Sequence, residues 1–508
     1  MQTGCKHIKS FKPIVKATLI IILFTGITRA LGFAYRIYLV NVIDAESLGI
    51  YQIALSVFTV LVTITSSGVP VTVSRTSAKY RAVNDYKSAN GAVMSAAAFM
   101  FVLACVFSIL ILIFKNLFSF VFTEQRCLPI FLSLIPAFIA SSIYSAFRGG
   151  LWGQKAFVAY SVTELLEEII LILFGIILTL SVDSVFEKTL SAAAAISISY
   201  CVAAVIAVII YIRRGGKFSK FNNQLKPLLT NSAPVTGARL MSAILTSVIA
   251  LILPLQLTMY GLTKSQALAE FGIVTGMTLP LLFLPGAIVG SLALVLVPEI
   301  SHHNELKNQA ELKKRIEGAL NFAVAVSLII IPAFVACGKE LCTFLYKNEK
   351  SGEYLQAFAF MMLPMSLNNI ASSVLNSLGK EYKALRNYCI GAITLVLCIF
   401  ILPQFIGVYA LLVGYILNLL ITAALNIICI NKHIKISFKF LLNTVILLVI
   451  AAPVIFFGYN LQSIFNLLKA PTFVSIAVML VCMASIVLVS VIFKILDFSM
   501  IFKKRESK

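Results

Sequence analysis

Two arginines lie inside the first long apolar stretch of the sequence, Arg29 and Arg36. Because they are seven residues apart, their side chains leave an α-helix within about 20° of each other. An arginine at the centre of a bilayer costs about 2.5–3.5 kcal/mol on insertion scales. This helix face must therefore line a bundle interior or a water-filled cavity, which suits an anionic cargo. The alternative for Arg36 is that it reaches the outer headgroups near Asp44.

A third intramembrane arginine, Arg239, lies in the seventh apolar stretch. The guanidinium fork matches the oxygens of a phosphate group, so Arg29, Arg36 and Arg239 predict a phosphate-binding site. The alternative for Arg239 is an ion pair with a glutamate of the fifth stretch. Arg75 ends the second stretch, where it gates the cytoplasmic mouth, binds cargo or is an ordinary basic residue of the cytoplasmic side.

Three carboxylates lie near the start of the fifth apolar stretch. Glu164, Glu167 and Glu168 have i, i+3, i+4 spacing and share one helix face. Three carboxylates on one intramembrane face are costly and should not all be ionised and unpaired. Two interpretations follow: they carry a proton or sodium ion coupled to transport, or Glu164 lies in the interface and the others neutralise arginines.

The eighth apolar stretch contains Pro280 and Pro285. Each proline removes a backbone donor, so we expect the helix to bend there. The bend is interpreted as a hinge for transport, with a static kink as the alternative.

The composition is that of a polytopic membrane protein. Of the 508 residues 60% are hydrophobic and 12% charged, whereas soluble domains carry about 25% charged residues. The sequence has no GxxxxGK[ST] loop and no acidic or histidine cluster in a large loop, so no catalytic residue and no enzyme activity are predicted. The ten cysteines show no metal-ligand spacing, and no metal site is predicted.

Apolar stretches long enough to span a bilayer predict an all-α protein with about fourteen transmembrane helices. They lie near 17–40, 50–73, 91–114, 128–147, 160–181, 190–212, 231–258, 271–298, 319–338, 354–378, 387–405, 408–430, 441–459 and 473–494. With the N-terminus in the cytoplasm, most of the 41 lysines and arginines fall in cytoplasmic loops. Both termini are therefore predicted to be cytoplasmic. The formal charge of +21 is a topology signal with contacts to anionic lipids, and no nucleic acid is expected.

A weak internal repeat divides the chain. Residues 139–148, IASSIYSAFR, resemble residues 370–379, IASSVLNSLG, six spans later. This predicts two six-span halves, 1–226 and 227–436, followed by two extra spans and a basic tail in 437–508.

Several motifs together resemble the stage V sporulation protein B group of the multidrug, oligosaccharidyl-lipid and polysaccharide (MOP) exporter superfamily, to which lipid II flippases belong. The resemblance covers almost the whole chain. It rests on Arg36 with LGIYQ at 48–52, GVP at 68–70 with Ser74 and Arg75, and Arg148-Gly149 with Gly153 and Glu167. It also rests on TGMTLP at 275–280 with PEIS at 298–301, and NSLGK at 376–380. The chain departs from the family where Tyr-Phe-Gln is replaced by residues 150–152, GLW, and where two glutamines are replaced by Glu164 and Glu168.

The resemblance implies two six-helix lobes around a central cleft, with two C-terminal helices forming a groove for a polyprenyl tail. It also implies alternating-access flipping of undecaprenyl-pyrophosphate-linked sugars, for cell-wall or spore-cortex peptidoglycan. We therefore predict a flippase in the cytoplasmic membrane of a bacterium, with a forespore membrane as a further location. The predicted cargo is a polyprenyl-pyrophosphate-linked oligosaccharide, lipid II first. No cofactor is expected beyond coupling to H⁺, Na⁺ or the membrane potential, and cell-wall synthesis enzymes are candidate partners. The alternatives are a cation-coupled multidrug exporter of the same fold and a non-transporting membrane scaffold.

Overall fold

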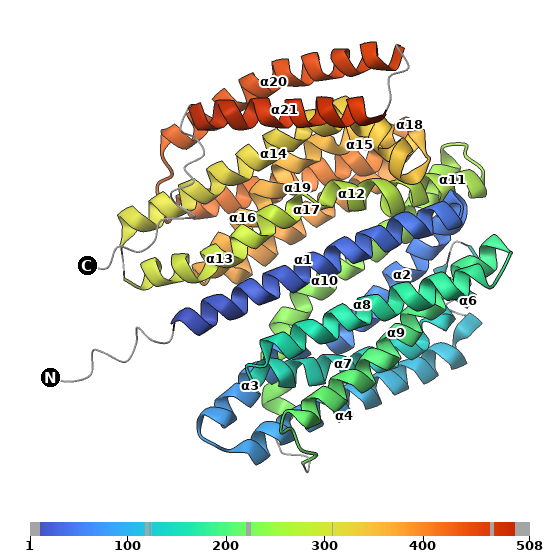
Figure 1. Cartoon of the computed structure of the whole chain (residues 1–508), viewed down its shortest axis with the longest axis vertical. Helices are drawn as coiled ribbons and strands as arrows, with labels where there is room; N and C mark the ends of the chain where they lie inside the picture. Colours follow the sequence, from blue (N-terminus) through green and yellow to red (C-terminus); the bar gives the residue numbers. More distant parts are fainter. Residues whose placement is uncertain are drawn as a thin grey trace. The chain divides into compact units, whose positions relative to one another are not determined.

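The computed structural model describes residues 11–116, 121–122, 124–219, 225–306, 308–467 and 472–492. These residues form helices joined by short connections, and none of them lies in a strand (Figure 1). The chain divides into two compact units, Met1–Leu255 and Gln256–Lys508. The division falls within helix α10, and the predicted boundaries after residues 226 and 436 stay predictions.

The helices of the first unit are α1 (Phe11–Val42), α2 (Ala45–Ser66), α3 (Val69–Ala82), α4 (Tyr86–Ile113), α6 (Cys127–Ser133), α7 (Ile135–Gly153), α8 (Phe157–Leu180), α9 (Val185–Arg213) and α10 (Leu225–Met259), whose last residues belong to the second unit. The second unit continues with α11 (Lys264–Gly272), the π-helix η2 (Ile273–Thr278), α12 (Leu279–Phe283), α13 (Gly286–Glu305), α14 (Gln309–Tyr346), α15 (Glu349–Phe358) and the 3₁₀ turn η3 (Ala359–Met361). It ends with α16 (Met362–Ser377), α17 (Glu381–Ile401), α18 (Pro403–Ile406), α19 (Tyr409–Asn431), α20 (Phe438–Leu467) and α21 (Thr472–Ile492).

Within the described residues, 11 helical segments are long and apolar enough to cross a membrane. The other three predicted spans coincide with α1, which carries Arg29 and Arg36, with α8, which carries three glutamates, and with α21, whose apolar segment Val474–Leu488 is shorter. The prediction of an all-α polytopic membrane protein is confirmed, and its count of fourteen spans is approximate.

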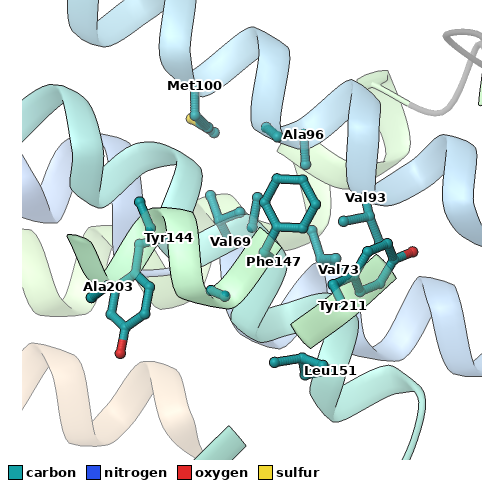
Figure 2. Packing of buried hydrophobic residues seen from close by; sticks show 14 of the residues in the cluster. Val69, Val73, Val93, Ala96, Met100, Tyr144, Phe147, Leu151, Ala203 and Tyr211 are labelled. Atoms are coloured by element: carbon teal, nitrogen blue, oxygen red, sulfur yellow. The ribbon is translucent and has the colours of Figure 1, made fainter. Parts of the chain in front are cut away.

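The core of the first unit lies where α7 meets α3, α4 and α9 (Figure 2). Phe147 of α7 packs edge to face on Tyr211 of α9, with ring centroids 5.3 Å apart. A Cβ atom at Gly149 would lie 2.8 Å from the carbonyl oxygen of Pro70, and one at Gly150 would lie 2.8 Å from the Tyr211 ring. Small residues let helices approach closely in a membrane, so these glycines place α7 against both neighbours.

The predicted second span is interrupted. Helix α2 ends at Ser66 and α3 begins at Val69, with Gly68 as its N-cap and Pro70 in its first turn. Proline lacks the N–H that would bond back into α2, and it is favoured in the first turn of a new helix. The sequence between 50 and 73 therefore forms two helices rather than one.

In the second unit, α20 and α21 run side by side and both pack on α14 (Figure 1). Gln462 Nε2 of α20 donates to Ser475 Oγ of α21 at 2.7 Å. Cys337 Sγ of α14 donates to the backbone oxygen of Ser475 at 3.2 Å. These buried contacts join the last two helices to α14.

A buried amide network joins α16, α17 and α19. Asn387 Nδ2 donates to Asn426 Oδ1 at 2.9 Å, and Asn426 Nδ2 donates to Asn368 Oδ1 at 3.2 Å. Asn387 and Asn426 are both fully buried. Pairing these amides removes the cost of leaving polar groups unsatisfied in an apolar interior.

Gly391 sets the separation of α17 and α19. A Cβ atom there would lie 2.3 Å from Thr422 Oγ1 and 2.7 Å from the carbonyl oxygen of Asn418. We expect Gly391→Ala to lower the free energy of unfolding by about 1–3 kcal/mol through overpacking, measured in mixed detergent micelles. Gly290→Ala is the matched control, since no heavy atom lies within 4 Å of its added Cβ. Equal effects of both changes would contradict the close approach.

Candidate functional site

Helix α1 packs on α8 through a series of close contacts. Tyr38 Oη and Thr179 Oγ1 share a hydrogen bond of 2.8 Å. A Cβ atom at Gly175 would lie 2.1 Å from Tyr35 Oη, so only glycine lets the tyrosine lie there. These contacts fix the register of α1 against α8, and with it the position of Arg29 and Arg36 along α8.

Gly32 lies between Arg29 and Arg36 on the same face of α1, at i+3 from the first and i−4 from the second. A Cβ atom at Gly32 would lie 2.7 Å from Glu168 Oε1, so the carboxylate of α8 lies against this face. Arg29 is exposed, and its charge acts on Glu168. Arg36 is half-buried, and its charge acts on Tyr51 of α2. The structure therefore brings Glu168 to the cationic face of α1.

Glu164 forms an ion pair that links α8 to α7. Arg148 Nη2 donates to Glu164 Oε2 at 2.9 Å, with the two side chains 17% and 30% exposed. The guanidinium lies over the rings of Tyr160 and Tyr144, 4.2 Å and 5.1 Å from their centroids. Cation–π contact and pairing together stabilise this arginine in an apolar helix.

Glu167 lies beside this pair. Its carboxylate interacts with Tyr144, Tyr200 and Arg148. The two tyrosine rings meet edge to face, with centroids 6.1 Å apart. Tyr144 and Arg148 are both largely buried, so Glu167 lies in a polar cluster inside the helix bundle.

Arg239 of α10 lies at the break between α2 and α3. Its Nη1 donates to the backbone oxygen of Ser67 at 2.8 Å, and its side chain is exposed. Its charge also acts on Tyr160, the residue that covers Arg148. The alternative prediction for Arg239 was an ion pair with a glutamate of the fifth stretch. Within the described residues Glu164 pairs with Arg148, and Arg239 donates to the carbonyl oxygen of Ser67.

Arg75 lies on α3 with an exposed side chain. Pro280 lies in α12, which continues η2 without a break. Pro285 lies in the turn between α12, which ends at Phe283, and α13, which begins at Gly286. Thr278 Oγ1 donates to the backbone oxygen of Ser351 at 3.0 Å, which ties the end of η2 to α15. An interruption is thus present at Pro285, whereas the bend at Pro280 and the hinge motion stay predictions.

Arg148 was not predicted as a site residue, because it directly follows the fourth apolar stretch, where basic residues of the cytoplasmic side are expected. In the structure α7 continues past it to Gly153. A tyrosine one turn earlier, Tyr144, and a glutamate near the start of the next helix were the available signals.

The Arg148–Glu164 pair generates a double-mutant test. We expect Arg148→Gln and Glu164→Gln each to lower the free energy of unfolding by about 1–3 kcal/mol, between values for exposed and buried pairs. The double variant should lose less than the sum of the two.

The i, i+4 pair Arg315–Glu311 on α14 is the control, with N–O 3.0 Å. It should contribute about 0.5 kcal/mol or less. Additive losses at Arg148 and Glu164 would show that the two do not act as a pair.

Comparison with known proteins supports this architecture. The family model described as "Polysaccharide biosynthesis protein" matches residues 14–303. The chain is 25% identical over 443 residues to stage V sporulation protein B of Bacillus subtilis (strain 168), covering 84% of this chain and 85% of that protein. It is 23% identical over 485 residues to the lipid II flippase MurJ of the same organism, covering 86% of each.

Solved structures share the fold. A multidrug resistance MATE family transporter of the MOP superfamily in an inward-facing conformation has TM-score 0.68 and 14% identity, covering 82% of this chain and 98% of that one. The lipid II flippase MurJ in an inward closed conformation has TM-score 0.67 and 14% identity, covering 94% and 99%.

The resemblance predicted from the sequence is confirmed, and the relatives named as transporter and flippase agree with the prediction of a non-enzyme. The chain is a multi-pass membrane protein that belongs to the polysaccharide biosynthesis protein family and has the fold of the MOP superfamily transporters.

Proposed function

We propose that this protein is an alternating-access flippase for a polyprenyl-pyrophosphate-linked sugar, with the peptidoglycan precursor lipid II as its cargo. The observation that carries the proposal is the cationic face of α1, where Arg29 is exposed and Gly32 leaves room for Glu168. An exposed arginine in a spanning helix needs water or an anion as its partner, because lipid solvates it poorly. The similarity to stage V sporulation protein B and to a lipid II flippase supports a lipid-linked cargo.

In this mechanism Arg29, Arg36 and Arg239 hold the pyrophosphate, since the guanidinium fork pairs with phosphate oxygens. Arg75 serves as a further cargo contact. The sugar crosses in the hydrated interior while the polyprenyl tail stays in lipid. Both termini are cytoplasmic in this proposal, because that orientation places most basic residues on the cytoplasmic side of a bacterial membrane.

The binding test uses purified protein in liposomes with fluorescent lipid II. We expect Arg29→Ala and Arg239→Ala each to weaken binding about tenfold or more, because a hydrogen bond to a charged group contributes about 1.5–3 kcal/mol. Headgroup accessibility on each side, followed over time, measures flipping. Lys432→Ala, an exposed cation after α19, is the matched control.

Binding that survives both arginine changes would overturn the cargo site. Protein that binds lipid II without moving its headgroup would favour the membrane scaffold. Protein that neither binds nor moves lipid II but exports cationic drugs would favour the multidrug exporter, an alternative supported by the three glutamates of α8 and by the MATE fold.

We propose that Glu167 and Glu168 carry the coupling cation, H⁺ or Na⁺, with Glu164 holding Arg148 in place. Protonation or cation binding at Glu168 changes the charge that Arg29 faces, so cargo phosphate and coupling cation compete for the same arginine. The membrane potential then contributes to the reset of the empty carrier.

We expect Glu168→Gln to make flipping insensitive to an imposed H⁺ or Na⁺ gradient while lipid II binding persists. The measurement is the initial flipping rate in liposomes with and without each gradient. Glu187→Gln, at the exposed start of α9, controls for loss of one negative charge. A gradient response that persists in both Glu167→Gln and Glu168→Gln would reject the coupling role.

A further inference from the structure

An apolar groove of about 500 Å³ runs between α7 and α9 on the first unit. Ile139 and Ile143 of α7 line one side, and Val205 and Ile209 of α9 line the other. Val205 is 59% exposed and Ile209 44% exposed, so the groove is open to its surroundings. In a spanning bundle these surroundings are hydrocarbon, and a groove of this kind holds an alkyl chain.

The inner end of the groove is closed by tight packing. One turn beyond Ile143, Phe147 meets the Tyr211 ring with centroids 5.3 Å apart. A chain lying in the groove therefore leaves it over Ile209 rather than between the helices. Arg213 follows Ile209 by four residues, about 40° around the helix.

Basic side chains gather at this exit. Arg213, Arg214 and Lys217 are all exposed at the end of α9. Ser219 Oγ donates to the backbone oxygen of Lys87 at 3.2 Å, which places the segment after α9 against the start of α4. Lys87 is also exposed, and its backbone lies against this basic segment.

The length of the groove matches one leaflet. From Arg213 to Cys201, the outermost lining residue of α9, the helix rises about 18 Å. Half of a hydrocarbon core is about 15 Å. A chain that starts from a headgroup at Arg213 therefore ends near Cys201, where the groove ends.

We propose that this groove is a binding site for an anionic diacyl phospholipid of the surrounding membrane. Its phosphate headgroup contacts Arg213, Arg214 and Lys217, and one acyl chain lies between α7 and α9. The site is on different helices from Arg29 and Arg239, so it holds a lipid that is not the transported cargo. The lipid covers the outer surface of α7 and α9, and α7 is the helix that carries Arg148.

The test uses the purified full chain and native mass spectrometry with phosphatidylglycerol and phosphatidylcholine of identical acyl chains. Val205→Trp fills the groove, and Val202→Trp, on the same helix but outside the groove lining, is its matched control. Arg213→Gln/Arg214→Gln/Lys217→Gln removes the cations. The control for this triple variant is Lys380→Gln/Lys383→Gln/Lys432→Gln, which removes three cations from the second unit.

We expect both test variants to bind the first phosphatidylglycerol about tenfold or more weaker, since each basic residue near the surface contributes about 1 kcal/mol. Both controls should bind as the unaltered protein does, and all variants should keep the thermal transition that shows folding. Equal binding of the two lipids, or phosphatidylglycerol binding unchanged in either test variant, would overturn the proposal. Binding of a polyprenyl phosphate in place of phosphatidylglycerol, lost in Val205→Trp, would also overturn it.

Discussion

The first unit depends on one constraint: a guanidinium in an apolar helix needs partners. Arg148 meets it with Glu164 at 2.9 Å and with the rings of Tyr144 and Tyr160. The pair links α7 to α8, while the glycines of α7 press the same helix against α3 and α9. Helix α8 in turn fixes α1, because Glu168 and Gly175 determine how closely α1 approaches. The position of Arg29 along α8 is therefore set by packing that begins at Arg148.

Much of the fold could be predicted from the sequence, because apolar length and the distribution of basic residues are local properties. The interruptions were harder to predict. The break at Gly68 and the π-helix Ile273–Thr278 lie within apolar stretches, and hydrophobicity does not register a change of backbone geometry. Pro70 was the available signal for the first break, and Pro285 was the available signal for the turn that follows α12.

The site shows the same division between local and tertiary information. The shared face of Glu164, Glu167 and Glu168 follows from helical spacing. Their partners do not, because Arg148 and Arg29 come from two other helices. The role of Arg148 was missed because the fourth apolar stretch ends at residue 147, directly before it. Its burial by tyrosines from α7 and α8 exists only after the helices pack.

The break between α2 and α3 has a consequence for charge. A helix end leaves carbonyl groups without donors, and Arg239 satisfies the one at Ser67. A carbonyl is neutral and accepts one of the five N–H groups of a guanidinium. The carboxylate of Glu164 neutralises the positive charge of Arg148. The bond to Ser67, by contrast, leaves the positive charge of Arg239 intact. The backbone thus holds a cation in place without neutralising it, and the remaining N–H groups of Arg239 stay available to an anion.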